Sequence, residues 1–276
     1  MNKTYKLGGD IEVNRLGYGG MQLTGPGTFG DVADRPGAIE IIRAAAAAGV
    51  NFFDTADAYG PHTNESLFAD ALAPYERPRA VIATKGGFTR PGPGQWVVNG
   101  NPNYLRQCID GSLQRLKLKT IDLWQLHRVD DKVALEESLA PVVEAVAAGK
   151  IKHVGLSEVT VAQVEQAQRI LPLASVQNLY NVSQRRWDDV LDYTAQNGLA
   201  FIPWFPLGSG PDGLGRPIQV LAAKRKVSVA QLALAWLLKR SNNILLIPGT
   251  KSLTHLRENL DAGSIELSDA EFASLR

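Results

Sequence analysis

The sequence predicts an α/β protein, a (β/α)8 TIM barrel that residues 1–276 form as a single domain. Eight short apolar runs alternate with amphipathic helical segments, and their starts are about 21 to 44 residues apart, which leaves room for a crossover helix each time. No shift in composition divides the chain. A doubly wound sheet is the main alternative, but the glycine-rich stretch Gly17–Met21 after the first run lacks the GxGxxG spacing and opens no helix.

A short hairpin precedes the barrel, over residues 4–16, and we expect it at the barrel bottom. Gly8-Gly9-Asp10 provides its turn and Ile11-Glu12-Val13 its second strand. The eight barrel strands are then predicted at Leu16–Tyr18, Asn51–Phe53, Ala80–Ala83, Ile121–Leu126, His153–Leu156, Ala174–Gln177, Ala200–Pro203 and Ile244–Ile247.

The helices are predicted from apolar side chains at helical spacing and from the residues that begin or end a helix. Asn64 and Ser228 are expected as N-caps, and Gly49 as a C-cap. The segment Phe88–Asn101, with glycines and prolines around Arg90, is instead expected to be a mobile flap. The predicted helices are Arg35–Gly49, Asn64–Leu72, Pro102–Leu118, Lys132–Ala148, Thr160–Leu171, Trp187–Gln196, Ser228–Lys239 and Ser268–Leu275.

Composition sets limits on partners and compartment. Of the 276 residues 45% are hydrophobic, and the net charge of +1 calls for neither nucleic acid nor an anionic membrane as a partner. The single cysteine, Cys108, excludes an internal disulfide and a multi-cysteine metal site, and we expect a buried thiol there and no metal. The start of the chain lacks the apolar core of a signal peptide and no apolar run could span a membrane, which predicts a soluble, cytoplasmic protein. We expect it to be a monomer or weak homo-oligomer.

Three neighbouring strands are followed or ended by ionisable residues. The second predicted strand leads into Asp54, the third into Lys85 and the fourth into His127, while Tyr59 lies on the loop after Asp54. In a barrel these strand ends share one face, where βα loops form active sites. Each residue alone has a structural explanation, such as a turn cap or a solvated strand end. Their conjunction on adjacent strands favours a site.

The chemistry of this group is that of proton transfer to an oxygen. A phenol is a poor acid at neutral pH, and a neighbouring ammonium such as Lys85 is expected to lower the pKa of Tyr59. Asp54 would keep the lysine charged by ion pairing, and His127 could donate to a substrate oxygen or relay a proton. None of these groups supplies a hydride, so a cofactor has to do so.

The residues Phe53–Gly60, Thr84-Lys85 and Leu126-His127 resemble the Asp, Tyr, Lys and His tetrad of the aldo-keto reductase superfamily. The tail, Ile247-Pro248-Gly249-Thr250 followed by Glu258-Asn259, resembles its nucleotide-binding segment, so the resemblance covers essentially the whole chain. It implies reversible, NADPH-dependent reduction of an aldehyde or ketone, with hydride going to the carbonyl carbon and a proton coming from Tyr59.

The resemblance also implies the cofactor contacts. Glu158 stands where many members have asparagine, and Trp204 stands where tyrosine is usual but still offers a flat face for the nicotinamide. The implied cofactor-binding residues are Gly20, Met21, Asp54, Ser157, Glu158, Gln177, Trp204, Phe205, Pro206, Leu207, Gly208, Ser209, Gly249, Thr250, Lys251, Ser252, His255, Glu258 and Asn259.

The tail bears on the choice of cofactor. Gly249 and His255 replace a lysine and an arginine that many members carry at these positions, which weakens the grip on a 2′-phosphate. Lys251, Arg257 and the neighbouring hydroxyls could compensate, so we expect NADPH, with NADH use left open. The implied substrate pocket, for a small-molecule carbonyl compound, consists of Tyr59, Phe88, Trp96 and His127.

Two other functions stay open on the sequence. Lys85 could be the Schiff-base nucleophile of an aldolase-like barrel enzyme. The chain could also be a non-catalytic, nicotinamide-binding regulatory subunit, although the complete tetrad argues against that function.

Overall fold

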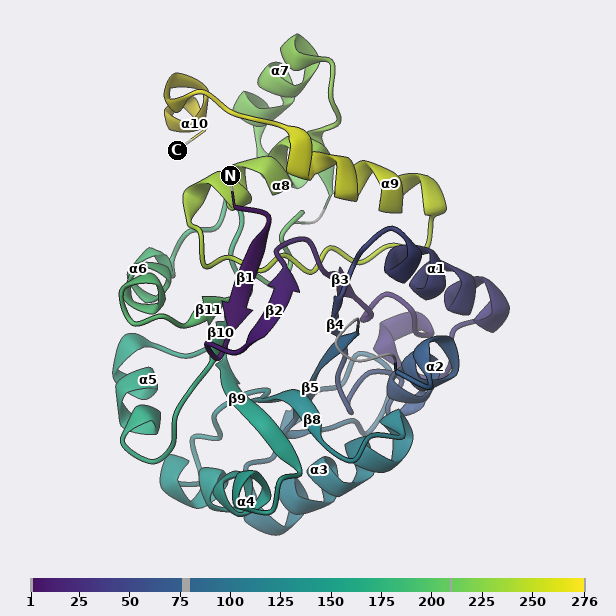
Figure 1. Cartoon of the computed structure of the whole chain (residues 1–276), viewed down its shortest axis with the longest axis vertical. Coiled ribbons are helices and arrows are strands. Elements are labelled where there is room, and N and C mark those ends of the chain that lie inside the picture. Colours follow the sequence, from purple (N-terminus) through teal and green to yellow (C-terminus); the bar gives the residue numbers. More distant parts are fainter. Residues whose placement is uncertain (1, 76–79, 209, 276) are drawn as a thin grey trace.

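The computed structural model describes residues 2–75, 80–208 and 210–275, and in it a curled parallel sheet is ringed by helices (Figure 1). Within these residues seven strands pair in the order β11-β10-β9-β8-β5-β4-β3, which follows the chain around the ring. Their bounds are β3 Tyr18–Gly19, β4 Phe52–Asp54, β5 Val81–Gly86, β8 Ile121–Leu126, β9 Ile151–Ser157, β10 Ser175–Gln177 and β11 Ala200–Phe201.

The eighth predicted strand, Ile244–Ile247, forms bridges instead of a ladder. Ile244 bridges Phe201 of β11 and Leu246 bridges Leu16, both in parallel, so the segment joins the two edges of the sheet. The next residue is Pro248, which has no N–H to extend the pairing. The barrel prediction is therefore confirmed, with its closing strand shorter than predicted.

The N-terminal hairpin lies across the end of the barrel where strands begin (Figure 1). β1 (Thr4–Leu7) and β2 (Ile11–Asn14) pair antiparallel, and Gly8 and Gly9 take the positive φ angles that their turn requires. Leu7 and Val13 are buried against Phe52, at the start of β4. The hairpin thus closes the barrel bottom, as predicted.

The helices confirm most of the predicted segments and add two. α7 and α9 were not predicted as helices, and both lie at one end of the molecule with α8 and α10 (Figure 1). Cys108 is buried in α3, as expected. The α-helices are α1 Arg35–Ala47, α2 Thr63–Leu72, α3 Pro102–Leu116, α4 Leu135–Ala147, α5 Val161–Gln168, α6 Asp188–Gln196, α7 Arg216–Arg225, α8 Val229–Arg240, α9 Leu253–Asp261 and α10 Asp269–Ser274.

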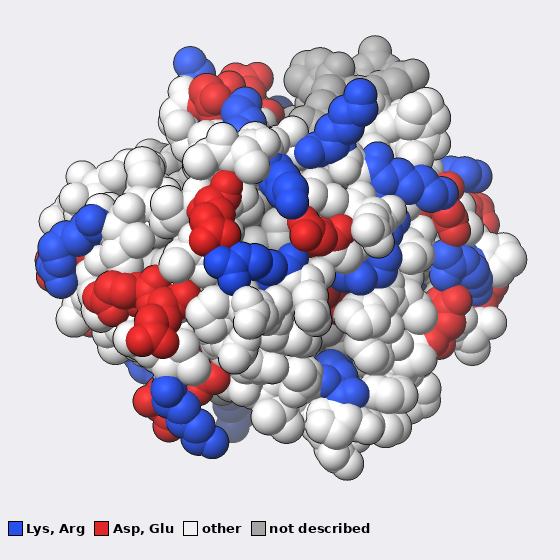
Figure 2. All heavy atoms as spheres, turned by 90° about the horizontal axis from the view of Figure 1, so that it is seen from below, with Lys and Arg blue, Asp and Glu red and all other residues white. Residues whose placement is uncertain are grey.

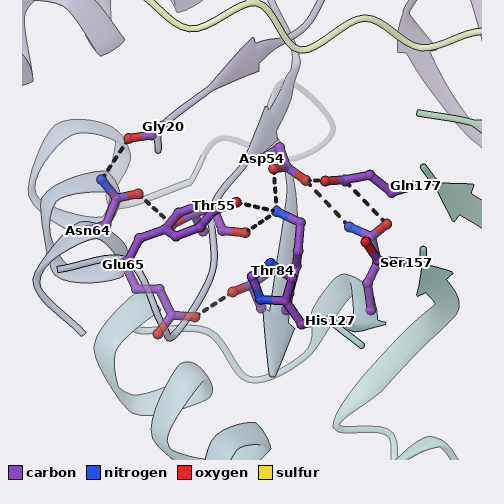
Figure 3. A network of polar contacts seen from close by, with 12 residues as sticks. Gly20, Asp54, Thr55, Asn64, Glu65, Thr84, His127, Ser157 and Gln177 are labelled. Carbon is purple, nitrogen blue, oxygen red and sulfur yellow. Dashed lines mark hydrogen bonds and ion pairs between the residues drawn. The ribbon is translucent and has the colours of Figure 1, made fainter. Parts of the chain in front are cut away.

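Asn64 is not the N-cap of α2, which corrects the prediction. Its side chain is buried, donates to the carbonyl oxygens of Gly20 and Leu23, both at 2.9 Å, and accepts from the Thr55 hydroxyl at 2.7 Å (Figure 3). A buried amide needs such partners, and here they join the loop after β3 to the loop after β4.

The segment predicted as a mobile flap is a β-hairpin tied to the barrel rim. β6 (Phe88–Thr89) pairs antiparallel with β7 (Val97–Val98). Between them Arg90 donates to four carbonyl oxygens, including those of Ala58 at 2.7 Å and Thr28 at 3.0 Å. Its guanidinium also lies 3.5 Å from the centroid of the Trp96 ring. Arg90, with all its guanidinium nitrogens hydrogen-bonded, therefore fixes this segment against the loop that carries Tyr59.

The surface carries charges of both signs. Figure 2 shows Lys and Arg side chains interspersed with Asp and Glu on one face, in keeping with a net charge of +1. In the part of the chain that the structure describes, no helix combines the length and the apolar character needed to cross a membrane.

Arg15 holds the seam where the barrel closes. Its side chain is buried and donates to the carbonyl oxygens of Ile244 at 3.0 Å, Leu238 at 2.9 Å and Asn2 at 3.1 Å, and also to that of Ser241. The guanidinium therefore connects the first strand segment to α8 and to the closing segment.

Replacing Arg15 by alanine should lower the free energy of unfolding by about 3 kcal/mol, because buried carbonyl oxygens lose a charged donor. Urea unfolding followed by circular dichroism measures this change. Arg106→Ala, which removes an exposed ion pair with Glu144, is the matched control and should change stability far less. Equal losses in both variants would contradict the role of Arg15 at the seam.

Candidate active site

The structure brings the four predicted side chains together at the carboxyl ends of the strands. Asp54 ends β4, Lys85 is the next-to-last residue of β5, and His127 directly follows β8. The Lys85 Nζ atom lies 2.5 Å from Asp54 Oδ1 and 3.3 Å from Tyr59 Oη. The Tyr59 and His127 rings meet edge to face, with centroids 5.9 Å apart.

Lys85 is fully buried and all three of its N–H groups have acceptors. Besides Asp54 and Tyr59, its ammonium donates to the Thr55 carbonyl oxygen at 2.9 Å. Burial disfavours the charge, but attraction by Asp54 and Tyr59 outweighs it and raises the pKa of Lys85. The lysine therefore stays charged at neutral pH.

The Asp54 carboxylate is held from its other side by amides of the barrel interior. Gln177 donates to Asp54 Oδ2 at 3.0 Å and Gln125 at 3.4 Å (Figure 3). The Gln177 nitrogen is thereby committed, which leaves its amide oxygen to accept from a ligand. The arrangement compensates a buried charge with an ion pair and with neutral donors.

Burial raises the pKa of Tyr59, and Lys85 opposes this rise without cancelling it. The expectation that the ammonium brings the pKa of Tyr59 below its ordinary value is therefore wrong for the site as it stands, because loss of solvent is the larger effect. The phenol stays protonated at neutral pH, as a proton donor must.

His127 is buried and neutral. Burial, with repulsion from Lys85, Arg128 and Arg90, holds the pKa of His127 well below its ordinary value. Its Nδ1 atom has no hydrogen-bond partner among the described residues. A neutral imidazole between Tyr59 and Phe88 can offer one N–H to a substrate oxygen.

A cavity of about 480 Å³ opens beside this group. All four residues of the predicted substrate pocket line it, and so do ten of the predicted cofactor residues: Met21, Asp54, Ser157, Gln177, Trp204, Phe205, Pro206, Leu207, Gly208 and Gly249. The cavity is also lined by Ile247 and Pro248, which belong to the tail segment singled out in the sequence, and by Gly19, Gln22, Thr28 and Arg128, which the sequence did not single out. Arg128 could have been found, since it directly follows His127.

Glu158 does not line the cavity. Its Oε1 accepts from the Trp204 indole N–H at 2.8 Å and from the Leu179 N–H, and its Oε2 pairs with Arg186 at 2.6 Å. With both oxygens committed, this carboxylate orients Trp204 and is not placed to hold a carboxamide directly.

The predicted tail residues after Gly249 do not line the cavity. Ser209 lies outside the described residues. The Thr250 hydroxyl accepts from the Ser252 N–H at 3.0 Å, and the Ser252 hydroxyl accepts from His255 N, the N-cap bond of α9. Lys251 and His255 are exposed beside this helix start, whereas Asn259 is buried. Thr250, Lys251, Ser252 and His255 therefore lie at the start of α9, which suits a phosphate, whereas Glu258 and Asn259 lie in the second half of this helix.

Two glycines of the predicted cofactor set are required by packing. A Cβ on Gly249 would lie 2.6 Å from the Gly19 carbonyl oxygen, and one on Gly20 would lie 2.3 Å from the Phe68 ring. Close backbone approach therefore explains why this chain has no lysine at position 249.

The donor set fits a nicotinamide nucleotide. Ser157 and the Gln177 oxygen can pair with a carboxamide, Trp204 offers a flat face, and the start of α9 offers N–H groups to a phosphate. Among the described residues no group of three or more His, Cys, Asp or Glu is placed to hold a metal ion.

The barrel and the polar group at its mouth define a barrel protein equipped to donate a proton, and comparison with known proteins assigns its family. The sequence profile described as Aldo/keto reductase family matches residues 15–211 and 214–276. The chain belongs to the aldo/keto reductase family of oxidoreductases.

Sequence similarity to known relatives extends over nearly the whole chain. An uncharacterized oxidoreductase of Schizosaccharomyces pombe is 45% identical over 97% of this chain and 87% of its own length. Pyridoxine 4-dehydrogenase of Escherichia coli is 40% identical over 99% of this chain and 97% of its own. An aldo/keto reductase from Klebsiella pneumoniae, solved in complex with NADP and acetate, superposes with a TM-score of 0.85 at 27% identity, covering 100% of this chain and 94% of that one.

Stability should depend on pH through His127. Because its folded pKa lies below the unfolded value of about 6.5, the unfolded state binds a proton first as pH falls, and stability is lost below that pH. As the pH falls below about 6.5, the free energy of unfolding of the wild type should therefore decrease by up to about 1.4 kcal/mol per pH unit more than that of His127→Gln. Urea unfolding at several pH values measures the difference.

The control is His255→Gln, which removes an exposed histidine. As the pH falls, this variant should lose as much stability as the wild type does. If the wild-type and His127→Gln curves run parallel below pH 6.5, His127 is not a buried neutral imidazole.

Proposed function

We propose that this chain catalyses the reversible, NADPH-dependent reduction of an aldehyde or ketone to the alcohol, with residues 1–276 acting as one barrel domain. The observation that carries the proposal is the Tyr59 hydroxyl, 3.3 Å from the Lys85 ammonium and beside the neutral His127 in a cavity. Membership of an oxidoreductase family supports it.

The geometry supports the following catalytic roles. Tyr59 and the neutral His127 are the donors for the carbonyl oxygen, and Tyr59 gives its proton as negative charge develops there. The bound nicotinamide supplies the hydride to the carbonyl carbon. Lys85 stabilises the phenolate that Tyr59 becomes, and Asp54 keeps Lys85 charged and oriented without touching the substrate.

Aromatic side chains around the acid exclude water and select flat substrates. The Phe88, Trp96 and Tyr59 rings pack edge to face, with the Phe88 and Trp96 centroids 5.3 Å apart. One relative is a pyridoxine 4-dehydrogenase, and these walls suit an aromatic ring. Pyridoxal is therefore the first carbonyl compound to test.

The Schiff-base alternative is not favoured. A nucleophilic lysine must lose its proton, whereas Asp54 and Tyr59 hold the pKa of Lys85 above its ordinary value despite burial. Its three N–H groups are also engaged. No contact in the described residues favours a purely regulatory role, which leaves the reductase as the proposal.

Tyr59→Phe should lower kcat for carbonyl reduction by at least about 100-fold, because the general acid is removed. The assay is NADPH oxidation with a panel of aldehydes and ketones that includes pyridoxal. Tyr5→Phe, at the opposite end of the barrel, is the control and should keep turnover. Wild-type rates in Tyr59→Phe, with NADPH binding intact, would refute the acid assignment.

NADPH should be preferred over NADH, with Lys251 contributing a charged contact to the 2′-phosphate. Lys251→Gln should then raise the KM for NADPH by about 10-fold and leave the KM for NADH nearly unchanged. Lys152→Gln, an exposed lysine at the start of β9, should change neither constant. A clear preference of the wild type for NADH would overturn the cofactor assignment.

A further inference from the structure

Arg128 is a cation in the wall of the cavity, and the proposed reaction gives it no role. It follows His127, lines the cavity, and is only partly exposed. Its guanidinium carbon lies 5.6 Å from the centroid of the Phe88 ring and 5.7 Å from that of Trp204. The charge therefore lies between the aromatic wall of the substrate pocket and the proposed nicotinamide platform.

The hydrogen bonds of Arg128 are incomplete. Its Nη1 donates to the His127 carbonyl oxygen at 2.6 Å and to the Ser157 hydroxyl at 3.0 Å, and no acceptor within the described residues takes Nε or Nη2. By contrast, Arg90 donates from all three of its guanidinium nitrogens to carbonyl oxygens. All guanidinium nitrogens of Arg90 are therefore used to hold the rim together, whereas Arg128 keeps Nε and Nη2 free to bind a ligand.

Arg128 also lacks a carboxylate partner. The acidic side chain that acts on it most strongly, Glu158, is already paired with Arg186 at 2.6 Å and bonded to Trp204. Within the described residues no ion pair is formed by Arg128 itself. A partly buried guanidinium without a counter-charge is costly, and an anionic ligand would remove that cost.

We propose that Arg128 is a specificity-determining residue that pairs with an anionic oxygen group, such as a carboxylate, on the carbonyl substrate. The guanidinium fork binds such a group with two parallel hydrogen bonds, while Phe88 and Trp96 hold the flat body of the substrate. Reduction then occurs at the end of that body nearest Tyr59 and His127. The substrate class is an aromatic aldehyde or ketone that carries an acidic group, and this class rests on the proposed reaction.

The test compares para-carboxybenzaldehyde with its methyl ester, which differ by one negative charge. In wild type kcat/KM should favour the acid, and Arg128→Gln should lower the acid-to-ester ratio by about 10- to 100-fold. Arg128→Lys, which keeps the charge but loses the fork, should give an intermediate ratio. Arg106→Gln, on the exposed face of α3, should leave the ratio unchanged.

A binding measurement separates this inference from the reaction itself. Calorimetric titration of the NADPH-saturated enzyme with the two alcohols, para-hydroxymethylbenzoate and its methyl ester, should show the same anion preference and its loss in Arg128→Gln. If the preference appears but neither aldehyde is reduced, the proposed function fails and the anion site stands.

Two results would overturn the assignment of Arg128. One is the absence of any acid preference in the wild type, in both rate and binding. The other is an equal fall for acid and ester in Arg128→Gln, together with weaker NADPH binding, which would place the guanidinium on the cofactor.

Discussion

The site depends on one buried ion pair, between Lys85 and Asp54. Such a pair is unfavourable unless further hydrogen bonds satisfy both charges, and here Thr55, Tyr59, Gln125 and Gln177 do so. Together with Asp54 and Lys85, these groups come from β4, β5, β8, β10 and the loop after β4. The ammonium can therefore remain charged beside Tyr59 only in a closed barrel, which links the stability of the fold directly to the chemistry at its mouth.

The surrounding polar contacts fix the loops around this pair. Asn64 joins the loops after β3 and β4, and Arg90 ties the β6–β7 hairpin to the loop of Tyr59. Beneath them Thr84, next to Lys85, donates to the buried Glu65 at 2.6 Å. Elsewhere on the same mouth, Glu158 orients Trp204 by accepting its indole N–H. The polar side chains that hold these loops have their hydrogen bonds satisfied, whereas Arg128, which lines the cavity, keeps free donors.

Sequence patterns predicted the barrel, the bottom hairpin and the meeting of Asp54, Tyr59, Lys85 and His127, because strand ends in a parallel barrel share one face. They did not predict the roles of Asn64, Arg90 or Glu158. Each of these side chains acts through partners that are distant in the sequence. The local sequence was equally consistent with an N-cap at Asn64, a mobile flap around Arg90 and a cofactor contact at Glu158. The net pKa of Tyr59 was also misjudged, since the balance between burial and Lys85 needs the three-dimensional structure.

The central claim is that Lys85, held by Asp54, tunes Tyr59 as the acid. It is tested most directly by the pH dependence of kcat/KM for carbonyl reduction in wild type and Lys85→Met. In wild type the rate should fall at alkaline pH as Tyr59 loses its proton. Without the ammonium the pKa of Tyr59 should rise further, so this fall should move to higher pH while the plateau drops. An alkaline limb that stays in place in Lys85→Met would contradict the account.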